Sequence, residues 1–350
     1  MKKLINIALD VDDVLMRCND YAIELENESG KYNPPMQLEE IHSWGKRNNR
    51  TDVINKYYSN ENFWKTQPVY PGAHDFVKEL CKIANVFITS AIPPEFMTTR
   101  ALRIMEEFPE IPSENIILGT RKDMYKFDII LDDAGHNILD SQAAYPILLR
   151  KPWNTDITGL LSVNNYNEAL YLINSIIKPE TVNPKDAKII ALVGPSGAGK
   201  TELMESLSNF SQPEPFTTNE QAGDRYRIVS DKQFQELKKT NQFLETTTYG
   251  GYHYGINKSD LETEKRVLVA VDICGAMALK RVYRNVSIVF IDADKKTLIA
   301  NILKKNLSEE EKVLRIVSLD HEKKNRELCD IVLNNDKGIL KLKEKFLSLL

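Results

Sequence analysis

An eight-residue pattern at positions 194–201 dictates the local backbone more strictly than any other part of this chain. It reads Gly-Pro-Ser-Gly-Ala-Gly-Lys-Thr, follows an apolar run at 188–193 and precedes a stretch with helical spacing. Glycines let backbone N–H groups close around phosphate oxygens, while the lysine reaches the β- and γ-phosphates and the threonine hydroxyl can bind Mg²⁺. The pattern therefore predicts a loop for the phosphates of ATP, formed by Gly194, Ser196, Gly197, Ala198, Gly199, Lys200 and Thr201.

A similar order, an apolar run and then a turn rich in functional groups, occurs near the N-terminus. Residues 4–9 lead directly into Asp10, Asp12 and Asp13. Continuous apolar runs are typical of strands buried on both faces of a parallel sheet, so each run opens an α/β domain. A length of 350 residues agrees with two domains, since one domain usually takes roughly 100–200 residues. We place the domains at 1–178 and 188–350, joined by a proline-containing linker at 179–187.

Strand-like and helix-like segments alternate in both halves, which predicts an α/β fold with a mostly parallel sheet in each domain. Strands are expected at 85–90, 127–131, 266–271, 286–291 and 331–333, and helices at 98–108 and 201–207. Residues from about 17 to 72 break the alternation, because they are polar and aromatic and have no strand pattern. We interpret them as a helical cap over an active site; the alternative is a helical subdomain whose aromatic residues form its own core.

Composition excludes several classes of protein. The 46 basic and 50 acidic residues give a net charge of −4, so no overall positive field indicates a nucleic-acid or membrane partner. The four cysteines are far apart and without metal-site spacing, which indicates reduced thiols in a cytoplasmic protein. No apolar run approaches the roughly 20 residues of a membrane span. The N-terminal apolar run is too short for a signal peptide, and we expect it to be part of the fold.

Acidic residues follow two of the expected strands in the first half, and hydroxyl residues follow a third. Paired carboxylates repel one another unless a cation lies between them, and two carboxylates at a strand end can share one Mg²⁺. Basic residues stand in the same part of the sequence and could balance a phosphate. The residues concerned are Asp10, Asp12, Thr89, Ser90, Arg100, Arg121, Lys122, Asp132 and Asp133.

This set, in this order, resembles the haloacid-dehalogenase-like phosphatases, and within them the 5′-nucleotidases and deoxyribonucleotidases, over roughly residues 1–175. The resemblance implies a Rossmann-like domain with a helical cap. It implies that Asp10 attacks phosphorus and that Asp12 serves as acid and then as base, while Thr89 and Ser90 hold phosphoryl oxygens. The implied magnesium ligands are Asp10, Asp12 through its backbone carbonyl, Asp132 and Asp133.

Two further roles follow from the same resemblance. Judged by its spacing to the apolar run at 116–118, Arg100 stands where the family usually has lysine, and Lys122 is the alternative. Either would neutralise the charge that develops on the phosphate. Phe63 and Trp64 precede a Pro-Gly-Ala stretch that is similar to the family's return from cap to core, which favours stacking on a nucleobase; core packing is the competing explanation for Trp64.

The second half, roughly 187–350, resembles the guanylate kinases. The resemblance rests on the phosphate loop, Thr217-Thr218, Phe243-Leu244-Glu245, a Tyr-Gly pair at 254–255, and Asn334-Asn335-Asp336. It implies that Tyr226 and Tyr254 contact the phosphate of the acceptor. It implies further that Glu245 and Asp272 face the acceptor's base or the transferred group, and that Arg315, in a mobile lid, approaches the transferred phosphoryl.

The second half also departs from the family pattern. Asn219 and Gln221 stand where the family has the arginines that bind the acceptor phosphate, and Arg225 and Arg227 lie nearby. Ile256 replaces a serine, and Ala270 replaces an aspartate. Because bidentate arginines recognise phosphate strongly, their absence weakens or relocates that contact.

Together the two halves predict a bifunctional enzyme with Mg²⁺ and ATP as cofactors and nucleoside monophosphates as substrates. One half would remove the phosphate of a (deoxy)nucleoside monophosphate, and the other would phosphorylate such a compound. The second hypothesis is a polynucleotide kinase joined to a 3′-phosphatase, against which the acidic net charge argues. The third is an active phosphatase joined to a guanylate-kinase-like module that binds without catalysis.

Overall fold

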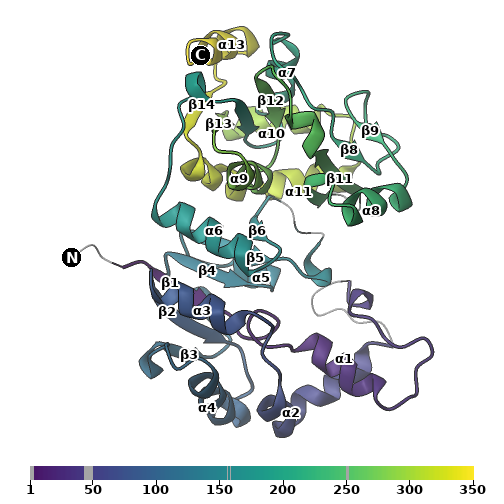
Figure 1. Ribbon diagram of the computed structural model, residues 1–350, viewed down its shortest axis with the longest axis vertical. Coiled ribbons are helices and arrows are strands. Elements are labelled where there is room, and N and C mark those ends of the chain that lie inside the picture. Colours follow the sequence, from purple (N-terminus) through teal and green to yellow (C-terminus); the bar gives the residue numbers. More distant parts are fainter. Residues whose placement is uncertain (1–3, 43–49, 156, 158, 250–251) are drawn as a thin grey trace. The chain divides into compact units, whose positions relative to one another are not determined.

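The computed structural model describes residues 4–42, 50–155, 157, 159–249 and 252–350. By its internal contacts the chain divides into two compact units. The first unit comprises Met1–Thr155 and Leu161–Ile177, and the second comprises Asp156–Leu160 and Lys178–Leu350. Each unit is an α/β structure with its own sheet (Figure 1), as the alternation of strands and helices predicted.

The first unit is built on a parallel sheet with the strand order β3-β2-β1-β4-β5-β6. The strands are β1 (Asn6–Leu9), β2 (Asn85–Ser90), β3 (Ile116–Leu118), β4 (Ile129–Asp132), β5 (Tyr145–Leu149) and β6 (Leu161–Val163). The accompanying helices are α3 (Ala73–Cys81), α4 (Met97–Glu107), α5 (Gly135–Leu139) and α6 (Tyr166–Ile177). Because all the strands are parallel, β1, β2 and β4 present their carboxyl ends at one edge, where the predicted site residues follow them.

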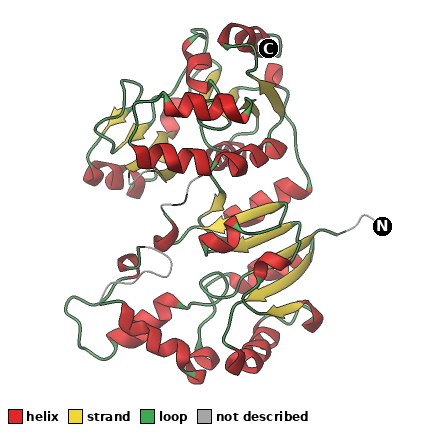
Figure 2. Ribbon diagram, turned by 180° about the vertical axis from the view of Figure 1, so that it is seen from behind, coloured by secondary structure: helices red, strands yellow, loops and turns green. Residues whose placement is uncertain are grey.

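The regular elements in the described part of the predicted cap region are helices, and no strand occurs among them. Its elements are α1 (Asn19–Asn27), η1 (Leu38–Glu40), η2 (Asp52–Ser59) and α2 (Glu61–Thr66). Figure 2 shows these helices in red, away from the strands of the same unit. They enclose a buried cluster that includes Ile54, Phe63 and Trp64.

The second unit contains a parallel sheet with the order β12-β7-β13-β14. Its strands are β7 (Ile189–Val193), β12 (Val267–Ala270), β13 (Val286–Asp292) and β14 (Ile331–Asn334). Its helices are α7 (Lys200–Glu205), α9 (Ile273–Val282), α10 (Lys295–Leu303), α11 (Glu309–Val317), α12 (Leu319–Lys324) and α13 (Ile339–Leu347). Every residue of β7 is buried, which explains its unbroken apolar run.

A second sheet in this unit was not predicted. It has the order β10-β11-β8-β9, with antiparallel pairing of β10 to β11 and of β11 to β8. The strands are β8 (Phe216–Thr217), β9 (Arg227–Ile228), β10 (Phe243–Tyr249) and β11 (Tyr252–Asn257), with α8 (Asp231–Lys239) between β9 and β10. Two-residue strands such as β8 and β9 are too short to give an alternating pattern in the sequence.

The range 179–187, predicted as a linker, is hydrogen-bonded to the second unit. Ser287 Oγ donates to the carbonyl of Val182 at 2.7 Å, and the backbone N–H of Val182 donates to Asp330 at 3.3 Å. Residues 156–160, which the sequence analysis placed in the first domain, also group with the second unit. The remaining short helices are η3 (Pro94–Phe96), η4 (Ser113–Asn115), η5 (Lys122–Met124), η6 (Pro152–Asn154), η7 (Pro184–Asp186), η8 (Lys258–Leu261) and η9 (Asn325–Leu328). Within the described residues, no helix has the length and apolar character needed to cross a membrane.

Candidate active sites

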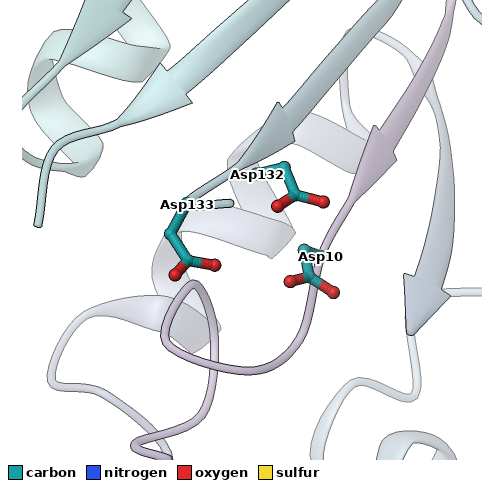
Figure 3. A group of neighbouring side chains, drawn as sticks. All are labelled: Asp10, Asp132 and Asp133. Carbon is teal, nitrogen blue, oxygen red and sulfur yellow. The ribbon is translucent and has the colours of Figure 1, made fainter. Parts of the chain in front are cut away.

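Three carboxylates meet at the carboxyl edge of the first sheet. Asp10 follows β1, Asp132 ends β4 and Asp133 comes next along the chain, and Figure 3 shows the three side chains turned toward one another. Each offers an oxygen that lies within 4.8 Å of the others, and all three residues are buried. Carboxylate oxygens are the ligands that Mg²⁺ prefers, so this donor set fits that ion.

One lysine balances part of this negative charge. Lys122 Nζ lies 2.7 Å from Asp10 Oδ1 and 2.7 Å from Asp132 Oδ2. Burial raises the pKa of Asp10 well above its usual range; Lys122 lowers it in part, and Asp132 and Asp12 raise it further. Burial likewise raises the pKa of Asp133. A single ammonium group does not neutralise three carboxylates, so the site would gain from a divalent cation.

The other basic candidate, Arg100, lies beside a different carboxylate. Its Nη2 atom is 2.8 Å from Asp12 Oδ1, and the same oxygen accepts a hydrogen bond of 2.8 Å from Gln67 Nε2. Arg100 Nη1 donates to Gln67 Oε1 at 3.0 Å, and its guanidinium lies 4.9 Å from the ring centroid of Trp64. The structure therefore brings both predicted basic residues to the site, Lys122 onto Asp10 and Arg100 onto Asp12.

The predicted hydroxyl residues lie at the end of β2, the strand beside β1. Thr89 and Ser90 are buried, at 1% and 0% exposure, and neither hydroxyl oxygen has a hydrogen-bond partner among the described residues. Leaving a buried polar group without a partner costs roughly 1–3 kcal/mol. Two such hydroxyls beside a cluster of carboxylates and cations are suited to binding the oxygens of a phosphate.

Several supporting residues were not predicted. Trp153 Nε1 donates to Asp133 Oδ2 at 2.8 Å, and Asn154 Nδ2 donates to the backbone carbonyl of Asp133 at 2.8 Å. Asp13 has a φ of 57° and accepts the backbone N–H groups of Cys18 and Asn19 at 3.0 Å, which fixes the start of α1. The contacts of Trp153 and Asn154 join residues 20 and 21 positions apart, which only the fold brings together. Asp13, in contrast, contacts residues five and six positions further along the chain.

The two predicted base-stacking residues lie in α2 and are buried. Phe63 and Trp64 are 2% and 5% exposed. The ring of Phe63 stacks on Tyr21 at a centroid distance of 5.3 Å and meets Trp64 edge-on at 5.1 Å. Trp64 Nε1 donates to the carbonyl of Tyr58 at 3.2 Å. Both side chains thus have a packing role in the cap, and their contact with a base stays a prediction.

In the second unit, residues 194–199 form a loop between β7 and α7 that only glycines can complete. Gly194, Gly197 and Gly199 have φ values of 142°, 85° and 101°. A Cβ atom on Gly194 would lie 2.1 Å from the carbonyl oxygen of Ile291, and one on Gly199 would lie 2.5 Å from Asn335 Nδ2. The sequence pattern at 194–201 therefore meets the backbone conformation that a phosphate loop requires.

Cationic side chains gather at this loop. Lys200 Nζ donates to the backbone carbonyls of Gly194 and Pro195, the latter at 3.0 Å. The pKa of Lys200 is lowered to about 8, mainly by burial; Lys305 and Arg315 contribute to the decrease, while Glu322 and Glu202 oppose it. Thr201, the predicted Mg²⁺ ligand, is exposed in the first turn of α7.

Ser196 is the point at which the predicted lid arginine reaches the loop. Its hydroxyl accepts hydrogen bonds from Arg315 Nη1 at 3.0 Å and from Lys305 Nζ at 3.3 Å. Arg315 comes from α11 and Lys305 follows α10, so neither is close to the loop in sequence. Lys305 was not among the predicted site residues.

The residues predicted to bind the acceptor form two pairs. The rings of Tyr226 and Tyr254 are 5.9 Å apart and nearly perpendicular. Burial and the neighbouring Tyr254 raise the pKa of Tyr226, whereas Arg315 and Arg225 act in the opposite direction. Asp272 caps α9 by accepting the backbone N–H of Gly275 at 2.8 Å. A Cβ atom on that glycine would lie 3.0 Å from Glu245 Oε1, so Glu245 and Asp272 meet at the start of α9.

At and near positions 219 and 221, where the guanylate kinase pattern has arginines, the side chains form hydrogen bonds and ion pairs with groups of the same unit. Asn219 Oδ1 accepts the backbone N–H of Gln221 at 2.9 Å. Arg225 pairs with Glu205 at 2.8 Å, and Arg227 pairs with Asp260 at 3.0 Å. Both arginines are thus paired with acids, and Arg225, together with Arg315, contributes positive charge near Tyr226.

Two family models match the chain and define its class. Residues 3–179 match the family described as 5′ nucleotidase, deoxy (Pyrimidine), cytosolic type C protein, and residues 186–346 match the family described as guanylate kinase. The chain belongs to the 5′ nucleotidase family through its N-terminal domain. Its C-terminal part, residues 186–346, is similar to the guanylate kinase family.

Individual relatives agree with both assignments. A 5′(3′)-deoxyribonucleotidase of Bacillus subtilis is 30% identical over 174 residues, which are 48% of this chain and 96% of that protein. A guanylate kinase of Trichormus variabilis is 29% identical over 125 residues, 31% of this chain and 61% of that protein. A guanylate kinase of Helicobacter pylori is 28% identical over 179 residues, 47% of this chain and 86% of that protein. The chain thus covers less than two thirds of the length of the Trichormus kinase.

Proposed function

We propose that this chain is a bifunctional cytoplasmic enzyme of nucleotide metabolism. Its first unit would hydrolyse the 5′-phosphate of a (deoxy)nucleoside monophosphate in a Mg²⁺-dependent reaction. Its second unit would transfer the γ-phosphate of ATP to a nucleoside monophosphate. The observation that carries the first activity is the buried carboxylate cluster of Asp10, Asp132 and Asp133 beside the unpartnered hydroxyls of Thr89 and Ser90.

In the first unit, Asp10 would attack phosphorus through a carboxylate oxygen, forming an oxygen–phosphorus bond as the bond to the nucleoside oxygen breaks. Asp12, oriented by Arg100 and Gln67, would give its proton to the leaving oxygen and then take one from the water that hydrolyses the aspartyl phosphate. Asp10, Asp132 and Asp133 would hold Mg²⁺, which supplies positive charge to the phosphate when bound.

In the second unit, the backbone of the phosphate loop and Lys200 would bind the phosphates of ATP, with Thr201 as a ligand of its Mg²⁺. Arg315 reaches the loop at Ser196 and also lies close to Tyr226, so it would stand between donor and acceptor. There it would neutralise the transferred phosphoryl group as its charge spreads. Tyr226 and Tyr254 would contact the acceptor phosphate, and Glu245 and Asp272 its base.

The two reactions oppose one another if they share a substrate. We infer that the units prefer different bases, so that the enzyme removes one monophosphate and promotes another. The altered acceptor region supports this inference, because Asn219 and Gln221 replace the arginines of the guanylate kinase pattern. Ile256 pairs with Glu245 across β10 and β11 and stands where the guanylate kinase pattern has a serine. The loss of that hydroxyl group supports a change in base preference as well.

A product screen across the common ribo- and deoxyribonucleoside monophosphates, with ATP and Mg²⁺, tests the proposal on the full chain. Asp10→Asn and Lys200→Met assign each product to one unit. We expect different preferred bases for hydrolysis and phosphorylation, and identical preferences would disprove the division of labour. Hydrolysis without any phosphorylation would support the alternative in which the second unit binds nucleotides but does not catalyse.

A further inference from the structure

Gln67 is a buried amide that lies between Asp12 and Arg100 in the first unit. Its Nε2 atom donates to Asp12 Oδ1 at 2.8 Å, and its Oε1 atom accepts a hydrogen bond from Arg100 Nη1 at 3.0 Å. The other terminal nitrogen of the same guanidinium, Nη2, donates to Asp12 Oδ1 at 2.8 Å. The three side chains therefore form a closed ring of hydrogen bonds.

Arg100 determines which end of the amide faces Asp12. A guanidinium group has only donors, so it must meet the amide oxygen, and the amide nitrogen then points to the carboxylate. The guanidinium is itself held, because it lies 4.9 Å from the ring centroid of Trp64 and its Nη1 atom contacts Met16 Sδ at 3.6 Å. The amide of Gln67 thus has one orientation that satisfies both neighbours.

The backbone at Gln67 is tied to its surroundings as well. Its carbonyl accepts a hydrogen bond from Arg103 Nη2 at 3.3 Å. The carbonyl of the next residue, Pro68, accepts the backbone N–H of Arg17 at 2.8 Å, which joins the chain returning from the cap to the segment that follows Asp12. The returning chain therefore brings the amide to Asp12 at a defined position.

The ring uses one of the two oxygens of Asp12. Oδ1 accepts both donors, and no hydrogen bond from a described residue reaches Oδ2. The side chain of Asp12 keeps 20% of its surface exposed, whereas that of Arg100 keeps 1%. A carboxyl group that exchanges a proton with a substrate must present one oxygen to the reacting atom. The ring leaves Oδ2 for that contact.

We propose that Gln67 is a positioning residue for hydrolysis, which holds Asp12 so that Oδ2 faces the leaving oxygen of the substrate. The inference rests on the proposed function of the first unit. It adds that Arg100 acts through Asp12 and Gln67, so that Lys122 is the basic residue that serves the phosphate itself. Because Gln67 lies on the chain that returns from the cap, Asp12 is held in this way only while that segment is in place.

The test compares two substrates of the full chain by kcat/KM, which reports the steps up to departure of the leaving group. One is the preferred monophosphate, whose leaving oxygen needs a proton, and the other is p-nitrophenyl phosphate, whose leaving group is a weak base and needs none. We expect Gln67→Met to lower kcat/KM roughly 10- to 100-fold for the monophosphate and less than about threefold for p-nitrophenyl phosphate. Gln142→Met is the matched control, since it makes the same change in an exposed glutamine, and it should leave both values unchanged.

Two further variants separate positioning from folding. Gln67→Glu keeps the size of the side chain and an acceptor for Arg100 but loses the donor to Asp12, so it should show the same selective loss as Gln67→Met. In the background of Asp12→Asn, Gln67→Met should cause no additional loss for the monophosphate, because the group that it positions is already removed.

Equal losses for the two substrates would overturn the inference, because Gln67 would then serve the fold or the phosphate. An additional loss in the background of Asp12→Asn, or unchanged kcat/KM in Gln67→Met, would overturn it too. If the wild type hydrolyses neither substrate, the proposed phosphatase function fails together with this inference. If the wild type hydrolyses both and Gln67→Met matches it, the inference alone fails.

Discussion

Both candidate sites are suited to phosphate, yet their charges are arranged in opposite ways. In the first unit, three buried carboxylates, Asp10, Asp132 and Asp133, face one ammonium group, that of Lys122. In the second unit, three cations, Lys200, Lys305 and Arg315, converge on the phosphate loop. The first site must take up a cation before it can bind an anion, whereas the second can bind a polyphosphate directly.

The comparison also separates side-chain chemistry from backbone chemistry. Both sites follow a buried strand of a parallel sheet, β1 in one unit and β7 in the other. The turn after β1 presents carboxylates, while the turn after β7 presents backbone N–H groups made accessible by glycines at positive φ. Point substitutions of the turn residues should therefore remove chemistry in the first unit, whereas in the second unit the side-chain effects should centre on Lys200.

The largest expected effect is the loss of one activity at a time. Asp10→Asn should lower hydrolysis of the preferred monophosphate at least about 10³-fold, because an amide oxygen is a poor nucleophile. Phosphorylation by the same chain should stay within about twofold of the wild type, since the second unit has its own core and sheet. Lys200→Met should give the reverse pattern. Both rates are measured on the full chain, and a variant that loses both activities would contradict the separation of the two sites.

Removing the lysine that pairs with Asp10 and Asp132 should cost stability. Lys122→Met leaves Asp10 and Asp132 buried without their partner, and breaking a buried pair in this way typically costs about 3–5 kcal/mol. The neighbouring Arg121→Met is the matched control, because that side chain is exposed and pairs with the partly exposed Asp123; it should change stability by less than about 1 kcal/mol.

Urea unfolding with and without Mg²⁺ measures both variants. Mg²⁺ should recover part of the loss in Lys122→Met, since the ion would supply positive charge to the same carboxylates. Equal stability of the two variants in the absence of Mg²⁺ would show that the carboxylate cluster does not depend on Lys122 for its charge balance.

Substitutions of the two hydroxyl residues at the end of β2 separate an effect on phosphate binding from an effect on stability. Thr89→Val replaces a buried hydroxyl that has no described partner with a methyl group of similar size. We expect the free energy of unfolding to stay the same or rise slightly, while kcat/KM for hydrolysis falls roughly 10- to 100-fold because a phosphate oxygen loses its donor. Ser90→Ala should behave in the same way. A loss of stability without a loss of kcat/KM would mean that the hydroxyl serves the fold.

The strands that lead to both sites could be predicted because they are buried on both faces and leave unbroken apolar runs. β5 was not predicted, since Pro146 stands within it and proline usually signals the end of a strand. Two strands of the antiparallel sheet, β8 and β9, were missed for a different reason: they have two residues each, and they become strands only through pairing with other segments. Local pattern carries no information about such pairs.

The same limit separates the predicted site residues from the missed ones. Asp10, Ser90 and Asp132 could be grouped in advance, because the carboxyl ends of neighbouring parallel strands must meet at one edge. Gln67 and Trp153 could not, since their contacts with Asp12 and Asp133 depend on how a cap segment and a loop return to that edge.

The smallest expected effect is a proton taken up when ATP binds. The pKa of Lys200 is lowered to about 8 from a usual 10.5, mainly by burial, so near pH 8 about half of the chains carry a neutral Lys200. Bound phosphates favour the charged ammonium, and binding at pH 8 should therefore draw roughly half a proton from solution, with almost none at pH 6.5.

Titration calorimetry in Tris and in HEPES at each pH gives the number of protons from the difference in heat. Lys200→Arg keeps the charge without titrating in this range, so its heat should lose most of the dependence on buffer. A wild-type heat that is the same in both buffers at pH 8 would show that Lys200 is already fully charged, and the contrast between a buried loop lysine and the salt-bridged Lys122 would then disappear.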